Sequence, residues 1–133
     1  MKLVIKSADQ KDTKQIYIMM REFAAHQNLL EYLEITEEIL HDILFSQDAF
    51  VQGLVALDDD TPIAYSFFYP YFSSFRGQRS VYLEDIFITE KYRQFGIGKR
   101  MLKEIAKIGK KEFGAVRMDF QVLRSNESAL GFY

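Results

Sequence analysis

The chain has 133 residues, 48% of them hydrophobic and 27% charged, and its 17 basic and 19 acidic side chains give a net charge of −2. This size predicts a single domain over residues 1–133, and the slight acidity argues against a nucleic-acid-binding protein. The chain has no run of about 18 apolar residues for a membrane span and no signal-peptide core, so we expect a cytoplasmic protein without membrane partners. Zero cysteines and two histidines exclude disulfides, thiolate metal sites and a cysteine nucleophile, and no metal centre is expected.

The first predicted elements are a short strand and a helix. Residues 3–6 form an apolar, strand-like run, and Asp9 or Asp12 is placed to cap the helix that follows. Apolar residues then recur at helical spacing, which predicts a helix that packs on a sheet. These apolar residues are Ile16, Met19, Met20, Phe23 and Ala24.

A second helix and a hairpin follow in the sequence. Thr36 is a good N-cap, and the two glutamates after it suit the positive end of a helix that runs to about Phe45. Residues 50–57 and 63–72 are strand-like and flank the turn-rich segment 58–62. They therefore predict an antiparallel hairpin.

The second half of the chain predicts a strand, a helix and another strand. Residues 81–88 form an apolar strand, residues 97–113 an amphipathic helix that ends at Gly114, and residues 116–122 a further strand. The buried stripe of this helix comprises Ile97, Met101, Ile105 and Ile108. Two strands joined by one helix should be parallel, with a right-handed crossover. Ser125 is placed to cap a last helix that continues to the end of the sequence.

The segment between strand 81–88 and the helix after it carries Arg93, Gly96 and Gly98 in the spacing Arg-x-x-Gly-x-Gly. Glycines permit close approaches that a side chain would block, so several N–H groups can point at one anion at the helix N-terminus. The dinucleotide fingerprint needs a third glycine and the Walker loop ends in Gly-Lys-Ser/Thr, so neither nucleotide motif fits. The segment predicts a pyrophosphate site, although an ordinary turn before a surface helix can carry the same glycines.

This segment resembles the Arg/Gln-x-x-Gly-x-Gly/Ala signature of the GNAT superfamily of N-acetyltransferases, and the order of predicted elements agrees with that family over nearly the whole chain. The resemblance implies an α/β (α+β) GNAT fold, with a mixed, mostly antiparallel central sheet, helices on both faces, and a parallel strand pair around the helix that binds coenzyme A. Three segments narrow it to the diamine (spermidine/spermine) acetyltransferase branch. They are residues 82–88 (Tyr-Leu-Glu-Asp-Ile-Phe-Ile), residues 92–98 (Tyr-Arg-Gln-Phe-Gly-Ile-Gly), and residues 126–129 (Asn-Glu-Ser-Ala) followed by Phe132 and Tyr133.

Glu84 and Asp85 are adjacent carboxylates in an otherwise apolar strand. Because side chains alternate along a strand, we expect the two to point to opposite faces. A charge on a covered face is costly unless it is paired or used, so we favour a functional role for Glu84 and a structural ion pair for Asp85. A carboxylate is useful here because a primary amine of pKa ~10.4 is protonated at pH 7, and freeing its lone pair costs roughly 4–5 kcal/mol.

The family resemblance implies roles for individual residues. Glu84 matches the acidic residue that holds the substrate amine and helps to remove its proton, and Tyr133 matches the general acid that protonates the leaving thiolate. The backbone of residues 86–88 would line the acetyl and pantetheine arm of acetyl-CoA, and residues 94–99 would surround its pyrophosphate. The implied cofactor-binding residues are Ile86, Phe87, Ile88, Arg93, Gln94, Phe95, Gly96, Ile97, Gly98, Lys99, Asn126, Ser128 and Ala129.

The chain departs from the diamine enzymes at two places near the substrate. They have an acidic residue at the end of the first helix, where Ala25, His26 and Gln27 stand here, and an aspartate after the aromatic strand, where Ser73 and Ser74 stand. His26 and Gln27 are our candidate substrate-binding residues, together with Glu84. A diamine, a polyamine, a lysine-like small amine and a protein amine all stay open as acceptors.

The resemblance also bears on assembly and activity. The family continues beyond the residue that Tyr133 matches, with the rest of a helix and two strands that this sequence lacks. A truncated chain, a degenerate enzyme, or a dimer that completes the sheet would each explain this, and a homodimer is our expected assembly. The leading function is transfer of acetyl from acetyl-CoA to a small primary amine by direct attack in a ternary complex. The alternative is an acyl-CoA-binding or interaction module without turnover.

Overall fold

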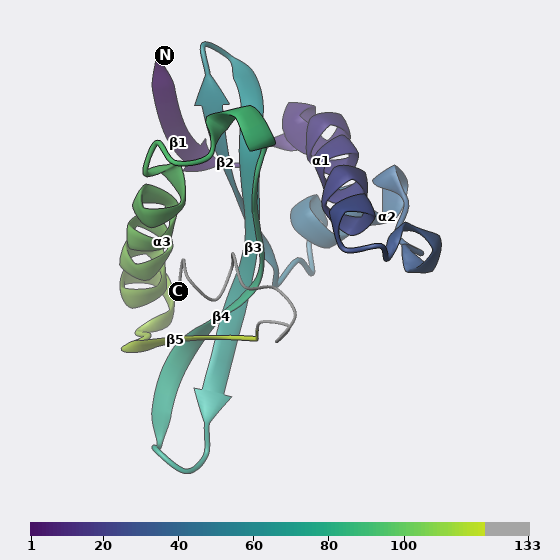
Figure 1. Cartoon of the computed structure of the whole chain (residues 1–133). Helices are drawn as coiled ribbons and strands as arrows, with labels where there is room; N and C mark the ends of the chain where they lie inside the picture. Colours follow the sequence, from purple (N-terminus) through teal and green to yellow (C-terminus); the bar gives the residue numbers. More distant parts are fainter. Residues whose placement is uncertain (122–133) are drawn as a thin grey trace.

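Five strands form one mixed sheet, in the order β1-β2-β3-β4-β5, in the computed structural model, which describes residues 1–121 (Figure 1). Strands β1 to β4 pair antiparallel in succession, and β4 and β5 pair in parallel. The strands are β1 (Leu3–Ser7), β2 (Gln52–Asp58), β3 (Thr61–Ser73), β4 (Gln78–Ile88) and β5 (Arg117–Phe120). This arrangement confirms the predicted sheet, which is mostly antiparallel with one parallel pair.

Helices cover both faces of the sheet, as the sequence predicts (Figure 1). Helices α1 (Thr13–His26) and α2 (Glu37–Phe45) lie on one face, and α3 (Ile97–Ile108) lies on the other and connects β4 to β5. The N-terminus of α3 therefore follows the carboxyl end of β4. The short helical turns are η1 (Gln10–Asp12), η2 (Leu30–Tyr32), η3 (Glu90–Tyr92) and η4 (Gly109–Phe113).

Capping side chains fix where the helices of the first half begin. The Thr36 hydroxyl accepts a hydrogen bond from the Ile39 N–H at 3.1 Å, so Thr36 is the predicted N-cap of α2. Of the two caps predicted for the first helix, Asp12 is the N-cap residue of α1 but makes no side-chain capping bond. Asp9 instead caps the short turn η1 by accepting from the Lys11 N–H at 3.1 Å.

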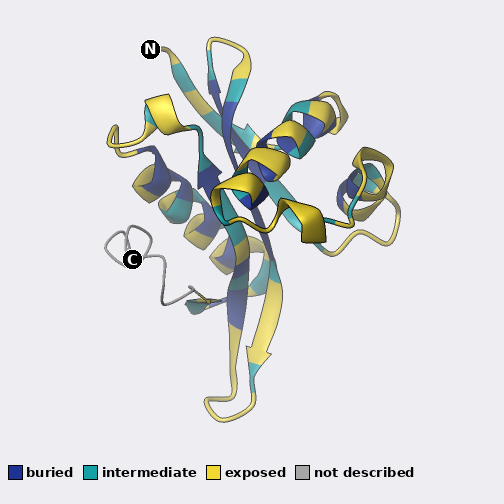
Figure 2. Cartoon of the chain, turned by 45° about the vertical axis from the view of Figure 1, so that its right-hand side comes forward, coloured by how far each residue is buried: buried dark blue, intermediate teal, exposed yellow. Residues whose placement is uncertain are grey.

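The sheet divides the core into two apolar clusters (Figure 2). On the α3 side, Ile97, Met101 and Ile105 are each at most 1% exposed, which confirms the predicted stripe, while Ile108 is only partly buried. The cluster on the other side joins α1 and α2 to the sheet. Its buried members are Ile16, Met19, Met20, Leu40, Leu44, Val55, Leu57, Tyr65, Phe67 and Phe87.

The β2–β3 hairpin has a tighter turn than the sequence predicts. Asp59 and Asp60 have positive φ angles of 52° and 81°, so a two-residue turn replaces the predicted turn over residues 58–62. Two left-handed residues match the right-handed twist of the flanking strands. Pro62 lies within β3 opposite Leu57, next to a register shift that accommodates a residue without an N–H.

The helix after the glycine segment is shorter than predicted. Helix α3 ends at Ile108, and the chain continues as a π-helical turn until Gly114, whose φ is 66°. At the junction, a Cβ added to Gly109 would overlap the Val81 Cγ2 methyl, so only glycine lets the chain pass this close to β4. The predicted helix that Ser125 would cap lies outside the described residues.

Candidate active site

The segment between β4 and α3 ends in a helix N-terminus without a capping side chain. Gly96 is the N-cap residue of α3 and has a φ of 77°, and Gln94 also has a positive φ, of 72°. Since glycine offers no capping oxygen, no side chain of residues 1–121 caps the first turn of α3, and its N–H groups can bind an anion. Gln94, Phe95 and Gly96 are all exposed. This geometry fits the pyrophosphate that the sequence predicts.

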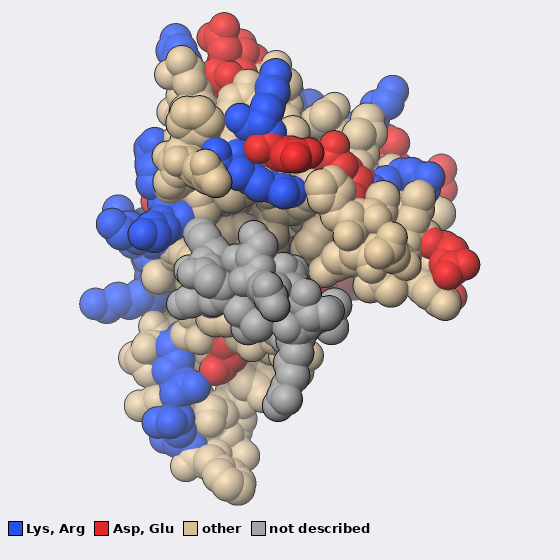
Figure 3. All heavy atoms as spheres, viewed as in Figure 1, with Lys and Arg blue, Asp and Glu red and all other residues tan. Residues whose placement is uncertain are grey.

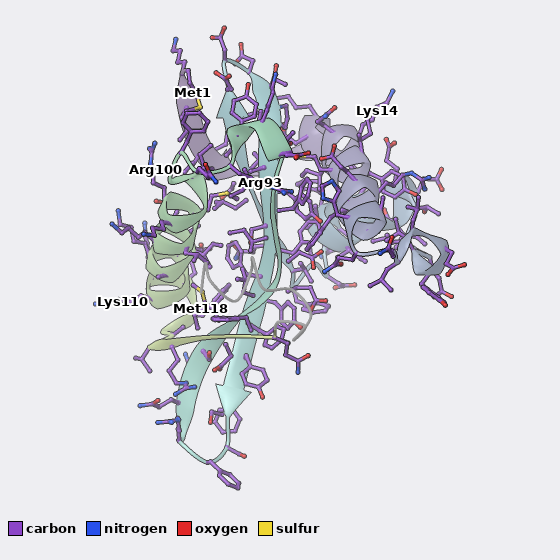
Figure 4. The ribbon with its side chains drawn as sticks, in the orientation of Figure 1. Met1, Lys14, Arg93, Arg100, Lys110 and Met118 are labelled. Carbon is purple, nitrogen blue, oxygen red and sulfur yellow. The ribbon has the colours of Figure 1, made fainter. Side chains whose placement is uncertain are left out.

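Arg93 links this segment to the end of β4 (Figure 4). Its Nε–H donates to the Ile88 carbonyl at 2.9 Å, and its guanidinium lies 5.5 Å from the centroid of the Phe87 ring. The Nη groups have no hydrogen bond or ion pair with any other described residue, so they stay available to a phosphate. Arg93 thus lies between the two predicted parts of the cofactor site.

Strand β4 has an open edge next to this segment. Strand β5 pairs with β4 only from Ser80 to Leu83, so residues 84–88 have no neighbouring strand on that side within the described part of the chain. Unpaired main-chain groups along a strand can pair with an amide-containing ligand as with another strand. The open edge of β4 (residues 84–88) is therefore a second candidate main-chain binding surface.

The pairing with β3 decides which main-chain groups face this open edge. The Thr89 N–H donates to the Ile63 carbonyl at 2.9 Å, which directs the main chain of Thr89 toward β3. Because main-chain groups alternate along a strand, those of Phe87 also face β3, and those of Ile86 and Ile88 face the open edge. Of the three residues predicted to contact the pantetheine arm, Ile86 and Ile88 have main-chain groups that face the open edge, and of these the Ile88 carbonyl already accepts from the Arg93 Nε–H.

A β-bulge interrupts β4 at Glu84. Phe67 is paired with Asp85 and Phe68 with Leu83, so two steps along β4 match one step along β3 and Glu84 has no partner. A bulge breaks the strict alternation of side chains between the two faces. The expectation that Glu84 and Asp85 point to opposite faces assumed a regular strand.

The expectation that the Glu84 and Asp85 side chains point to opposite faces of the sheet is wrong. The Tyr69 hydroxyl donates to Glu84 Oε1 at 3.1 Å, and the Asp85 carboxyl interacts with Tyr65. Tyr65 and Tyr69 are four residues apart in β3, so their side chains lie on the same face, the face that α1 covers. The bulge therefore brings both carboxylates to one face, and we call Glu84 and Asp85 the carboxylate pair.

The two members of the carboxylate pair have different surroundings. Glu84 is exposed, whereas Asp85 is partly buried. Burial raises the pKa of Asp85 to about 6, helped by repulsion from Glu84 and partly opposed by Tyr65. Neither carboxylate forms an ion pair with a described residue, so the structural ion pair predicted for Asp85 is absent from residues 1–121.

Two tyrosines accompany the carboxylate pair. Tyr65 is 0% exposed, and its hydroxyl lies near Asp85 without a hydrogen bond of normal geometry to any described residue. Burial, followed by the Asp85 charge, raises the Tyr65 pKa well above its usual value. Burial and the hydrogen bond to Glu84 raise the pKa of Tyr69 to about 12. Both tyrosines therefore stay neutral at physiological pH.

His26 lies beside the same part of β4. At the end of α1, its ring meets the Phe87 ring edge-on, with 6.1 Å between centroids, and Phe87 stacks on Phe23 at 5.2 Å. Gln27 is the C-cap residue of α1. The structure thus brings His26 to the end of β4, two residues from Asp85 along the strand. Tyr133, Asn126, Ser128 and Ala129 lie outside the described residues.

Basic side chains follow the exposed face of α3 (Figure 3). Lys99, Lys103 and Lys107 recur every four residues and are all exposed. Lys99 lies in the first turn, beside the uncapped N–H groups. This row of positive charge would attract an anionic cofactor toward the segment.

The sequence alone did not predict that Asp85 lies on the same face of the sheet as Glu84. The adjacent acids were the only signal in the sequence, because the bulge at Glu84 arises from the pairing of its neighbours with Phe67 and Phe68 in β3, 16 or more positions away from Glu84. Among residues 1–121, no group of three or more acidic or histidine side chains is placed to hold a metal ion. No helix formed by these residues is long and apolar enough to cross a membrane.

Residues 15–133 match the Acetyltransferase (GNAT) family. The chain belongs to this family. It is 30% identical over 139 aligned positions to the thialysine N-epsilon-acetyltransferase of Bos taurus, covering 98% of this chain and 81% of that protein. It is 31% identical over 137 positions to the enzyme of the same name from Mus musculus, covering 97% and 79%. It is also 26% identical over 141 positions to the spermidine/spermine N(1)-acetyltransferase-like protein 1 of Homo sapiens, covering 97% of this chain and 19% of that protein. The GNAT chain is therefore an acyltransferase, and these relatives together confirm the resemblance to the diamine branch.

Solved structures agree with the GNAT fold. An aminoglycoside acetyltransferase from an uncultured soil metagenomic sample, in complex with trehalose, superposes with a TM-score of 0.79 at 21% identity, covering 98% of this chain and 84% of that one. The ribosomal-protein-alanine N-acetyltransferase of Brucella melitensis gives 0.76 at 18% identity, covering 98% and 88%. At these identities the likeness shows the fold.

Proposed function

We propose that this GNAT enzyme transfers an acetyl group from acetyl-CoA to the primary amine of a small molecule, by direct attack in a ternary complex. The observation that carries the proposal is the carboxylate pair at the β4 bulge, next to the open edge of the same strand. An amine held by these carboxylates would lie beside a thioester held along that edge. The relatives named as acetyltransferases of thialysine and of L-ornithine support a small acceptor.

The main-chain groups would hold the cosubstrate. Acetyl-CoA supplies a thioester carbonyl, and N–H groups at the open edge, at Ile86 and Ile88, would pair with its pantetheine arm and stabilise the tetrahedral oxyanion. The first turn of α3 and the Arg93 guanidinium would bind the pyrophosphate. Tyr133, outside the described residues, stays our predicted general acid for the leaving thiolate.

The carboxylate pair would prepare the amine. Glu84, being exposed, attracts the substrate ammonium, and the stacked rings of Tyr69 and Tyr82, 5.3 Å apart, form an aromatic wall beside it. Glu84 is our predicted base, acting through water. Asp85 is a second candidate, because a pKa of about 6 suits a group that must accept a proton near pH 7.

A substrate screen tests this function. Purified protein is incubated with acetyl-CoA and thialysine, lysine, ornithine, diamines, polyamines or a lysine-containing peptide, and released thiol is measured. We expect turnover with a small molecule that carries a primary amine at the end of an alkyl chain. Turnover only with the peptide would favour a protein amine acetyltransferase. Coenzyme A binding by calorimetry without any turnover would favour the non-catalytic binding module.

The homodimer and the cytoplasmic location also stay proposals. Size-exclusion chromatography with light scattering checks the first, which fails if the intact chain is a folded monomer. A fluorescent fusion expressed in cells, followed by fractionation, checks the second.

A further inference from the structure

A hydrogen bond connects the segment before α3 to the far end of the β2–β3 hairpin. The Tyr92 hydroxyl donates to Asp58 Oδ2 at 2.6 Å, across 34 residues of sequence. Tyr92 is the last residue of η3, directly before Arg93, and Asp58 is the last residue of β2. Figure 1 shows η3 next to the tip of this hairpin. We call the Asp58–Tyr92 bond the clasp.

Asp58 is well placed to anchor a neighbouring segment. Its Oδ1 accepts from the Lys2 N–H at 3.1 Å, and Asp58 is paired with Leu3 in β1 and with Thr61 in β3. The carboxylate therefore belongs to a part of the sheet where three strands pair side by side. The hydrogen bond from Tyr92, and then that from the Lys2 N–H, lower the Asp58 pKa, so the clasp has a charged acceptor at neutral pH.

Residues 93–96, which follow Tyr92, have few other contacts that restrain them. Residues 93–96 are all exposed, and two of them, Gln94 and Gly96, have left-handed backbone conformations. Within residues 1–121, the side-chain hydrogen bonds that hold this segment are the clasp on one side and the Arg93 bond to the Ile88 carbonyl on the other. The Tyr92 ring also packs against the α3-side cluster.

We propose that Asp58 and Tyr92 are positioning residues for acetyl-CoA, because the clasp holds residues 93–99 in the conformation that binds the pyrophosphate. This inference rests on the proposed function. Without the clasp, the segment would have to be ordered at the moment of binding, and that entropy would be subtracted from the affinity. The bond lies far from the carboxylate pair, so the amine side of the reaction is untouched.

The test compares coenzyme A binding among matched variants. Tyr92→Phe deletes only the hydroxyl, Asp58→Asn keeps a neutral acceptor, and Asp58→Ala removes it. Calorimetry with coenzyme A should give a Kd raised about three- to tenfold for Tyr92→Phe and Asp58→Ala, with Asp58→Asn in between. The control is Tyr17→Phe in α1, because the Tyr17 hydroxyl has no hydrogen bond with another described residue.

Kinetics separate positioning from general damage to the fold. The KM for acetyl-CoA should rise with the Kd, while kcat and the KM for the amine stay within about twofold of wild type. The double variant Asp58→Ala/Tyr92→Phe should bind coenzyme A no more weakly than Asp58→Ala alone, since that variant has already lost the clasp, together with the bond from the Lys2 N–H. Additive losses, or equal losses in both KM values, would show that the residues act through overall stability.

Failure of this inference differs from failure of the proposed function. If wild-type protein does not bind coenzyme A, the proposed function is wrong. If wild type binds and Tyr92→Phe binds equally well, the function stands and the clasp has no positioning role.

Discussion

The two candidate parts of the active site are built from different chemical groups. On the cofactor side, the groups are main-chain N–H groups of the α3 first turn and of the open edge of β4. On the amine side, they are the side chains of Glu84 and Asp85, with Tyr65 and Tyr69 around them. A main-chain site depends on backbone conformation, and a side-chain site depends on strand register. The two should therefore respond to different substitutions.

The largest expected effect is on catalysis at the carboxylate pair. Asp85→Asn and Glu84→Gln each keep the size of the side chain but remove its charge. Loss of the base should lower kcat by about 100-fold or more, while the Kd for coenzyme A, which belongs to the main-chain site, stays unchanged. Steady-state kinetics with calorimetry on the same samples measure both.

The pH profile identifies which carboxylate is the base. If Asp85 accepts the proton, kcat/KM of wild type rises as pH increases through about 6, because Asp85 must be ionised. Burial is the larger cause of the raised Asp85 pKa, and Glu84→Gln removes the repulsion that adds to it, so the rise in kcat/KM should move to lower pH. If kcat/KM of Asp85→Asn still rises through the same pH range, Glu84 is the base instead.

The next effect in size is on the stability of the amine side. The folded-state pKa of Asp85, about 6, lies above the ordinary 3.8, so between these values the folded chain holds a proton that the unfolded chain has released. The contribution of Asp85 to the free energy of unfolding is therefore fully present below pH 3.8 and is lost as the pH rises through 6. Asp85→Asn should gain on the order of 2 to 3 kcal/mol over wild type at pH 8, because two pKa units at 1.36 kcal/mol each are no longer lost.

Urea unfolding of both proteins from pH 4 to pH 8 measures this difference. The gain should vanish near pH 4, where Asp85 is protonated in the folded state. A difference between the two proteins that does not change with pH would mean that the Asp85 carboxyl is well solvated.

The local parts of this fold could be predicted from the sequence. Ile97, Met101 and Ile105 have helical spacing and are all buried, and Thr36 caps its helix, because neighbours in the chain decide both features. The left-handed Gly96 was also predictable, since glycine at a helix start has a direct conformational meaning. The α3 part of the main-chain site therefore follows from a short stretch of sequence, whereas the open edge of β4 depends on where β5 pairs.

The side-chain site could not be predicted in the same way. The bulge at Glu84 depends on pairing with Phe67 and Phe68, residues 16 or more positions away, and no local pattern records that register. The tight turn at Asp59 and Asp60 was missed for a related reason: several turn-forming residues stand in a row there, and the strand pairing selects which two form the turn.

A fourth prediction concerns the packing of the end of α3 against β4. Gly109→Ala gains about 1 kcal/mol of helix propensity, but the new methyl would overlap Val81 Cγ2, and Val81 is only 1% exposed and cannot move aside. Overpacking costs typically ~1–3 kcal/mol, so we expect a net loss of stability. Thermal unfolding measures it. The double variant with Val81→Ala should lose less than the sum of the two single losses, which a clash requires and a propensity effect does not.

The smallest expected effect separates backbone strain from cofactor binding. Gly96 and Gly77 both have positive φ angles, 77° and 61°, and a Cβ at either would meet no atom within 4 Å. Alanine in this left-handed region should therefore cost each variant about 1 kcal/mol of stability through backbone conformation alone. Gly77 lies in the turn between β3 and β4, away from the cofactor segment, whereas Gly96 begins α3. If the main-chain site binds the pyrophosphate, Gly96→Ala should also raise the Kd for coenzyme A several-fold and Gly77→Ala should leave it unchanged. Equal Kd values for the two variants would remove the α3 N-terminus from the cofactor site.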